Sequence, residues 1–346
     1  MRKPNMDIRR RWIQVVLAGC LVLTALPASA EWFSRDEAIM GTAVRVELWR
    51  DDAAAAQADM AAVMDEMHRI DELMSPYKPA SELSLINREA AQKALPISLE
   101  MYNLIARSLE FSRLSGGAFD ITFSSVGYMY DYRRHIKPTD AQIAKALPGI
   151  NYRHLLLDPA AHTIHFTRPG MRIDLGGIAK GYAVDNCIAI LRKRGVTNAI
   201  VTAGGDSRLL GDRHGRPWMV GIRDPRKRGA VVAVLPLANT AISTSGDYER
   251  YFVENGVRYH HIIDPKTGKS ATGVRSVTVI APEGIITEGL TKSVFVHGPK
   301  DGMALIESYK GAEAIIIDAH GNMTFSPGLR EVSGGAASSA GPPKKP

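Results

Sequence analysis

Residues 173–185 read IDLGGIAKGYAVD, and this stretch decides how the chain is interpreted. A short apolar run ends at Leu175, a glycine pair follows, and a helical pattern then continues to Leu191. Backbone amides at such a helix start can face a phosphate, the glycines would allow close approach, and Lys180 would add a positive charge. A glycine turn that only packs a strand against a helix has the same sequence, so the stretch alone leaves both interpretations open.

Toward the N-terminus from this stretch, strand and helix periodicities follow one another. Apolar and outward-facing residues alternate over residues 44–48, which predicts a strand with one buried face. From residue 53 to 75 apolar residues recur every three or four positions, which predicts an amphipathic helix. A second helix is predicted over residues 97–114, because Ser-Gly-Gly directly after it is a typical C-terminal stop.

The second half of the chain is rich in predicted strands. Short apolar or alternating runs bounded by Gly, Pro and Asp occupy residues 199–202, 218–222, 231–235, 259–263, 277–280 and 314–317. Helices are expected after Gly177, after Ile286 and over residues 303–309. No repeat of fixed period is present, and residues 331–346, rich in Gly, Ser, Ala and Pro, predict a disordered tail.

Length and charge exclude several classes of protein. The chain has 346 residues, of which 45% are hydrophobic, so it can bury one large core or two small ones and is not a disordered chain. The formal net charge is +7, but residues 1–30 hold five basic side chains against one acidic one and contribute +4 of it. The remaining +3 predicts no groove for a polyanion and therefore no nucleic-acid partner.

Residues 1–30 have the pattern of an export signal peptide. Three arginines at 9–11 precede an uncharged apolar stretch over residues 12–26, and Ala-Ser-Ala at 28–30 suits signal peptidase. The stretch is shorter than the roughly twenty residues of a membrane span. We therefore predict cleavage after Ala30 and a periplasmic location. Two alternatives stay open: a lipoprotein box that would place a lipid anchor at Cys20, and a weak twin-arginine pattern.

Several familiar catalytic and cofactor-binding motifs are missing from the sequence. It has no His-Glu-x-x-His, no paired Cys-x-x-Cys, no Gly-x-Ser-x-Gly and no Gly-x-Gly-x-x-Gly after a strand, which disfavours zinc hydrolases, serine esterases and ordinary dinucleotide dehydrogenases. Without Cys20 the mature chain would hold one cysteine, Cys187, which cannot form an internal disulfide. Its apolar helical surroundings predict a buried thiol and not a nucleophile.

Further polar clusters are expected at strand ends, where loops on a rigid sheet carry function. They are AGGD at 203–206, STSGDY at 243–248 and HHIIDPKTG at 260–268. Together with residues 40–42, 81–87, 117–122 and 173–185, in this order, they resemble the FAD:protein FMN transferase family, the ApbE-like flavin transferases. The resemblance extends from about Ala38 to about Pro327. It implies an α+β fold, ApbE-like and T-fold-related, with mixed sheets and packed helices in a single domain over residues 31–330.

This resemblance implies a specific activity. Members of the family bind FAD, use Mg²⁺, split the pyrophosphate and leave FMN esterified to a Thr or Ser of an acceptor flavoprotein, releasing AMP. The acceptor would be a periplasmic or membrane protein, for example in an inner-membrane redox complex. The family positions that contact FAD correspond here to Met40, Tyr77, Ala118, Phe119, Asp120, Asp174, Lys180 and Ile262. His261 corresponds to the family histidine thought to help deprotonate the acceptor hydroxyl.

The chemistry makes sense of these residue types. A Thr hydroxyl is a poor nucleophile, and an imidazole that titrates near neutrality is a suitable base. A divalent ion together with Lys180 would offset the negative charge of the pyrophosphate and the charge that develops during phosphoryl transfer. The alternative for His261 is a buried histidine that donates to a backbone carbonyl.

The expected metal site departs from the family pattern. By the resemblance its ligands are Glu288, Thr291 and the Gly177 carbonyl, but Lys292 stands where the family has an uncharged hydroxyl. Spacings of three and four place Glu288, Thr291 and Lys292 on one helical face. Lys292 would either turn outward and leave a weakened Mg²⁺ site, or pair with Glu288 and fill the cation's place. The third alternative is a non-catalytic FAD- or FMN-binding accessory protein of a periplasmic respiratory system.

Overall fold

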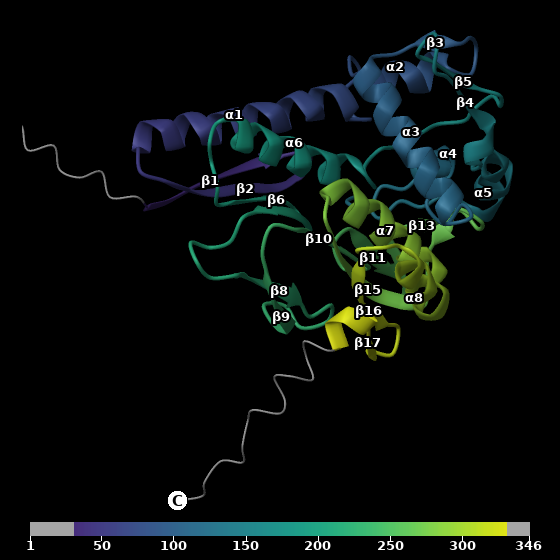
Figure 1. The fold of residues 1–346 in the computed structure, drawn as a ribbon. Helices are drawn as coiled ribbons and strands as arrows, with labels where there is room; N and C mark the ends of the chain where they lie inside the picture. Colours follow the sequence, from purple (N-terminus) through teal and green to yellow (C-terminus); the bar gives the residue numbers. More distant parts are fainter. Residues whose placement is uncertain (1–30, 331–346) are drawn as a thin grey trace, which may run out of the picture.

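The core of the fold is an eight-stranded antiparallel sheet (Figure 1). The computed structural model describes residues 31–330, so the expected signal peptide with Cys20 and the expected tail lie outside the described residues. In spatial order the strands are β1 (Glu31–Ile39), β2 (Thr42–Arg50), β6 (Ala199–Ala203), β7 (Asp206–Leu210), β10 (Ala241–Gly246), β15 (Val274–Ala281), β16 (Glu313–Asp318) and β17 (Met323–Phe325).

A two-residue turn joins β1 to β2. Ile39 pairs with Thr42, so Met40 and Gly41 form the whole loop, and both have positive φ, of 55° and 68°. Positive φ at both central residues defines a type I′ turn, whose twist matches that of the two strands. The turn presents Met40 at the tip of the hairpin, where its side chain packs half-buried against the main core.

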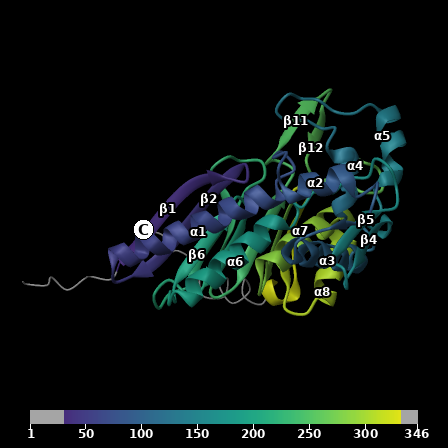
Figure 2. The ribbon, with the colours of Figure 1, turned by 90° about the horizontal axis from the view of Figure 1, so that it is seen from above.

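Four helices cover one face of the sheet: α1 (Ala53–Met74), α6 (Ala179–Lys193), α7 (Gly284–His297) and α8 (Pro299–Ser308). Figure 2 shows α1 and α6 lying side by side above β2 and β6. Asp52 caps α1 by accepting from the amides of Ala54 and Ala55, and the stripe of Met60, Met64 and Met67 is buried against the sheet. The predicted amphipathic helix is confirmed.

The opposite face carries a hairpin formed by β8 (Trp218–Arg223) and β9 (Val231–Leu237). Successive side chains of a strand point to opposite faces of a sheet. Val201 therefore joins the core under the helices, while its neighbour Ile200 packs with Trp218 in a second cluster under the hairpin. Both faces of the central strands are covered in this way.

The remaining elements lie beside α7, with α3 in contact with α7 and a β11–β12 hairpin that projects outward in Figure 2. They are α2 (Glu82–Glu89), β3 (Leu95–Pro96), α3 (Leu99–Leu114), α4 (Ser124–Gly127), α5 (Asp140–Ala146), β4 (Leu155–Asp158), β5 (Thr163–Phe166), β11 (Tyr251–Glu254), β12 (Val257–His260), β13 (Ile263–Asp264), β14 (Lys269–Ser270) and the 3-10 turns η1 (Ile121–Phe123), η2 (Leu147–Gly149) and η3 (Tyr152–His154). Within residues 31–330, no helix has the length and apolar character to span a bilayer.

Most expected elements are present, and three differ. The STSG segment, expected at a strand end, forms the last four residues of β10, a strand that was not expected. The strand expected over residues 259–263 is interrupted, because β12 ends at His260 and β13 begins at Ile263. The interruption places His261 and Ile262 in a turn beside the helix layer. α7 also begins at Gly284, two residues before Ile286, after which a helix was expected.

Helices α6 and α7 approach each other unusually closely. A Cβ on Gly284 would lie 2.6 Å from the Gly181 carbonyl oxygen, and a Cβ on Gly181 would lie closer still to the Gly284 carbonyl. Asp185 of α6 accepts from the Gly284 amide at 2.8 Å and from the Ile285 amide at 2.9 Å, so it caps the start of α7. This contact fixes α7 against α6.

We expect Gly181→Ala to destabilise the protein by about 3 kcal/mol, since the added methyl group would meet backbone atoms that cannot move aside. Chemical denaturation followed by circular dichroism measures the loss. Lys193→Ala, exposed at the end of the same helix, serves as the control and should change stability by less than about 0.5 kcal/mol. Equal stabilities of the Gly181→Ala variant and the wild type would contradict the close contact.

Candidate functional site

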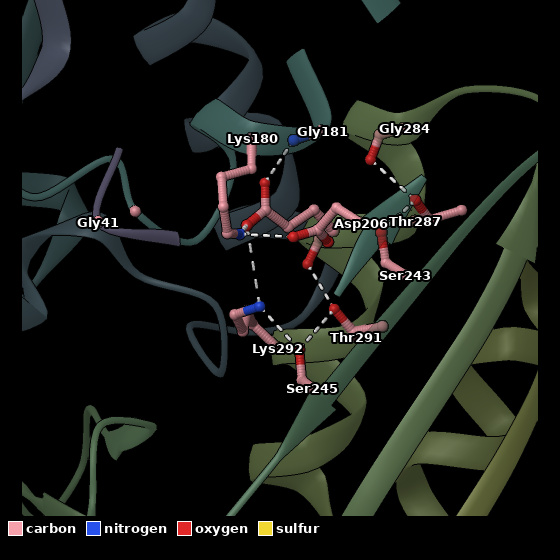
Figure 3. Close-up of polar contacts among 12 residues, drawn as sticks. Gly41, Lys180, Gly181, Asp206, Ser243, Ser245, Gly284, Thr287, Thr291 and Lys292 are labelled. Atoms are coloured by element: carbon pink, nitrogen blue, oxygen red, sulfur yellow. Dashed lines mark hydrogen bonds and ion pairs between the residues drawn. The ribbon is translucent and has the colours of Figure 1, made fainter. Parts of the chain in front are cut away.

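A buried cluster of charges lies between α6, α7 and β7 (Figure 3). Glu288 of α7 is 0% exposed, and its carboxylate accepts from the Gly181 amide at 2.8 Å and from the Lys180 ammonium. The same Lys180 Nζ is 2.6 Å from Asp206 Oδ2. Burial alone would lower the pKa of Lys180, but the two carboxylates outweigh it and raise that pKa. Lys180 is therefore a fixed positive charge.

Lys292 turns inward, toward the space that Lys180 also faces in Figure 3. Its ammonium donates to Ser245 Oγ at 2.7 Å and is 4.0 Å from Glu288 Oε1. Ser245 Oγ donates in turn to Thr291 Oγ1 at 3.0 Å, and Thr291 donates to the Glu288 carbonyl at 2.8 Å. Of the arrangements expected for Lys292, the outward one is thus wrong, and pairing with Glu288 is the one that the structure contains.

His261 lies in the turn between β12 and β13. Its Nδ1 atom is buried and has no hydrogen-bond partner within residues 31–330. Burial, followed by the positive charges of Lys292 and Arg250, lowers the pKa of His261 well below its usual value, so the imidazole is neutral at pH 7. The expectation of an imidazole that titrates near neutrality is therefore wrong for His261. Its neighbour His260 instead places Nε2 2.9 Å from the Ala271 carbonyl. The alternative of a histidine bonded to a backbone carbonyl therefore describes His260.

Two of the expected flavin contacts, Tyr77 and Phe119, differ sharply in exposure. Tyr77 is 84% exposed, and desolvation of its hydroxyl together with the negative charge of Asp174 raises its pKa. Phe119 is buried, with its ring 3.4 Å from the position that a Cβ on Gly177 would occupy, and Lys292 Cγ is 3.6 Å from the same position. The structure thus brings Phe119, Gly177 and Lys292 together.

Other expected flavin contacts are already engaged within the protein. The Asp120 carboxylate accepts from the Thr122 amide at 2.9 Å, the Thr122 hydroxyl at 2.6 Å and the Tyr152 amide at 2.8 Å. Ala118 and Ile262 are buried, and the Ile262 carbonyl accepts from the Ala271 amide. These residues can form the wall of a site, and Asp120 acts first as the cap of its own turn.

The glycine-rich stretch differs from the expected phosphate cradle. The amides of Ile178 and Ala179 both donate to the Leu175 carbonyl, at 2.9 and 2.8 Å. The amide of Gly181 donates to the Glu288 carboxylate. The Asp174 carboxylate accepts from the Gly176 amide at 2.6 Å. The expectation of free amides at this helix start is therefore wrong for residues 178, 179 and 181, and the positive charge here comes from side chains.

Sequence reasoning missed two residues of the cluster. Asp206 was named only as part of the AGGD cluster and given no role, yet its Oδ1 is buried with no hydrogen-bond partner in the described part of the chain. Arg250 lies two residues beyond the STSGDY motif, and its Nη2 is 3.5 Å from the Gly41 carbonyl. Its positive charge acts on His261, Asp174 and Lys292. A charged residue directly after a recognised motif was the signal available for Arg250.

The expected metal ligands do not suit Mg²⁺ with Lys292 in this position. Mg²⁺ binds oxygen at about 2.1 Å, so an ion on Glu288 Oε1 would lie within about 6 Å of the Lys292 ammonium. With an effective dielectric constant of about 20, that repulsion is about 5 kcal/mol, or more than three powers of ten in affinity. Within residues 31–330, His, Cys, Asp and Glu side chains form no group of three or more that could hold a metal ion.

The chain is similar to known proteins over most of its length. The family model described as the ApbE family matches residues 40–316. The FAD:protein FMN transferase of Treponema pallidum is 32% identical over 86% of this chain and 87% of its own, and that of Vibrio cholerae is 31% identical over 86% and 91%. The crystal structure of the ApbE protein from Thermotoga maritima superposes with a TM-score of 0.81, at 34% identity over 87% of this chain and 99% of that one. The chain therefore belongs to the ApbE family, and the expected mixed α/β single-domain fold is confirmed.

We expect an NMR titration of the imidazole protons to give His261 a pKa below 6.5. The sign follows from burial and from Lys292 and Arg250, which all disfavour the imidazolium ion, so the ring gains its proton only at lower pH. Lys292→Met removes one of these charges and should raise the pKa of His261, whereas the exposed Lys300→Thr should leave it unchanged. A pKa that does not rise in the Lys292→Met variant would contradict this electrostatic picture.

Proposed function

We propose that this protein is an FAD:protein FMN transferase that leaves FMN on a Thr or Ser hydroxyl of an acceptor protein and releases AMP. The relatives described above carry that name, and the similarity to this chain covers most of their length. The observation that carries the proposal for this chain is the unpartnered Nδ1 of a neutral His261 beside three positive groups, Lys180, Lys292 and Arg250. A base next to a cationic site is what phosphoryl transfer to a hydroxyl requires.

The proposed reaction moves one phosphoryl group and changes no oxidation state. The acceptor hydroxyl oxygen forms a bond to the phosphorus of the FMN half. The bond from that phosphorus to the bridging oxygen breaks, and AMP leaves with this oxygen and its electron pair. His261 takes the hydroxyl proton on the unprotonated ring nitrogen of its neutral imidazole. The protein contributes mainly orientation and electrostatic stabilisation.

The residues around His261 have defined tasks in this proposal. Lys180, Lys292 and Arg250 offset the two negative charges of the pyrophosphate. Met40 and Tyr77, at two rims of the site, provide apolar and aromatic surface for the isoalloxazine ring. Tyr77 has the exposure that a flavin would cover.

Location and partners follow from the same proposal. We infer that residues 1–30 direct export, that the transferase domain of residues 31–330 acts in the periplasm, and that its acceptor is a flavoprotein of an inner-membrane redox complex. Export would bring the enzyme to such an acceptor. A lipid anchor at Cys20 would give the same location.

A non-catalytic flavin-binding accessory protein is the second candidate function. The inward position of Lys292 favours it, because that ammonium stands beside the carboxylate expected to hold the metal. The unpartnered His261 favours the transferase, because a protein that only stores flavin has no use for a buried base.

We expect the wild type, incubated with FAD and an acceptor domain of the Asp-x-x-(Ser/Thr)-Gly-Ala-Thr type, to produce a fluorescent flavin band on a denaturing gel. His261→Ala should slow this transfer by about 100-fold or more, since it removes the base, while FAD binding measured by titration is retained. His320→Ala changes an exposed histidine and serves as the control.

The outcomes separate the two functions. Bound FAD without a labelled acceptor in any reaction with the wild type would identify the accessory protein. A His261→Ala rate equal to that of the wild type would remove His261 from the mechanism while leaving the transferase intact.

A further inference from the structure

We propose that the Lys292 ammonium replaces the divalent cation in this enzyme, so that it transfers FMN without a bound metal ion. The inference rests on the proposed transferase function. Its basis is the disagreement between the expected ligand set and the contacts that the structure contains: Glu288 is paired with two lysines, and Lys292 stands 4.0 Å from Glu288 Oε1.

Neighbouring side chains hold the ammonium of Lys292 in place. Its ammonium donates to Ser245, which is itself fixed by the hydrogen bond to Thr291. Its aliphatic stem passes over Gly177, with Cγ 3.6 Å from where a Cβ would be. The residue expected to lend its carbonyl to a metal thus makes room for the lysine instead. An ammonium has three N–H donors, and Lys292 uses one for Ser245 and directs one toward Glu288. One donor remains for a phosphate oxygen.

Lys292 supplies a second ammonium for two buried carboxylates. Lys180 and Lys292 carry two positive charges against the two negative charges of Asp206 and Glu288. An uncharged residue at position 292 would leave Lys180 alone to pair with both of these carboxylates. Buried charges are tolerated when they are paired, so a position that lacks the ammonium needs another cation. Lys292 meets this need within the chain.

An ammonium can perform the electrostatic part of the reaction. It donates to a phosphoryl oxygen and stabilises the charge that collects on the bridging oxygen as AMP leaves. No proton transfer from Lys292 is required, and no further reactant enters. The positive charge of Lys292 also contributes to the lowered pKa of His261.

The first experiment compares FMN transfer by purified full-length protein in EDTA and in millimolar Mg²⁺. The wild type should react at rates within about twofold of each other. Lys292→Thr, which restores an uncharged hydroxyl, should lose transfer by about 100-fold in EDTA and regain it in Mg²⁺. Lys292→Met should be slow under both conditions, because it supplies neither an ammonium nor a ligand, and Lys292→Arg should stay independent of metal. Lys300→Thr, the same substitution at an exposed lysine, should behave as the wild type.

A second readout does not depend on activity. Mn²⁺ titration followed by electron paramagnetic resonance should show no stoichiometric site in the wild type and one site in Lys292→Thr. Circular dichroism melting identifies a variant that has failed to fold, in which case the wild-type comparison decides alone.

The inference and the proposed function can fail separately. A wild type that transfers FMN only with Mg²⁺, or that binds one Mn²⁺ stoichiometrically, overturns the inference and leaves the transferase intact. A wild type that labels no acceptor under either condition overturns the transferase. The Mn²⁺ titration would still decide whether Lys292 holds the place of the cation.

Discussion

The buried carboxylate of Glu288 is the constraint on which the rest of the site depends. A charge removed from water is costly unless it is paired and hydrogen-bonded. Glu288 meets this condition because α6 brings both the Gly181 amide and the Lys180 ammonium to it. That approach exists only because glycines face each other where α6 meets α7. The close packing of α6 on α7 therefore also determines how Glu288 is paired and where Lys180 points.

The sheet supports this arrangement with polar side chains that point toward the helices. Ser243 pairs with Thr287 at 2.6 Å, and Ser245 joins Lys292 to Thr291. A helix buried on all sides ordinarily carries apolar residues. Here each of these hydroxyl groups has a hydrogen-bond partner. α7 can therefore stay buried while its polar side chains face β10. A site built on a central strand and a buried helix is more rigid than one built on loops.

The sequence predicted the parts of the fold that have a clear period. The methionine stripe of α1 and the alternation in β2 depend on local spacing, and both are present. The polar strand β10 was not predicted, because its hydroxyl groups find their partners on a helix about forty residues away. The metal segment expected from the resemblance contains Glu288, which the structure places against Lys180 and Gly181. The direction of Lys292 could not be predicted, since helical spacing places a residue on a face but does not choose between its rotamers.

The thiol of Cys187 has a consequence for how the protein can be handled. It lies at 0% exposure beneath α1, with Sγ 3.6 Å from the Val63 carbonyl, and burial raises its pKa. It is the free cysteine of residues 31–330, and no covalent crosslink braces this part of the chain. Thiolate is the reactive form of cysteine. Folding within these residues is therefore indifferent to the redox potential of its surroundings, and reductants can be added to or left out of a preparation without changing the domain.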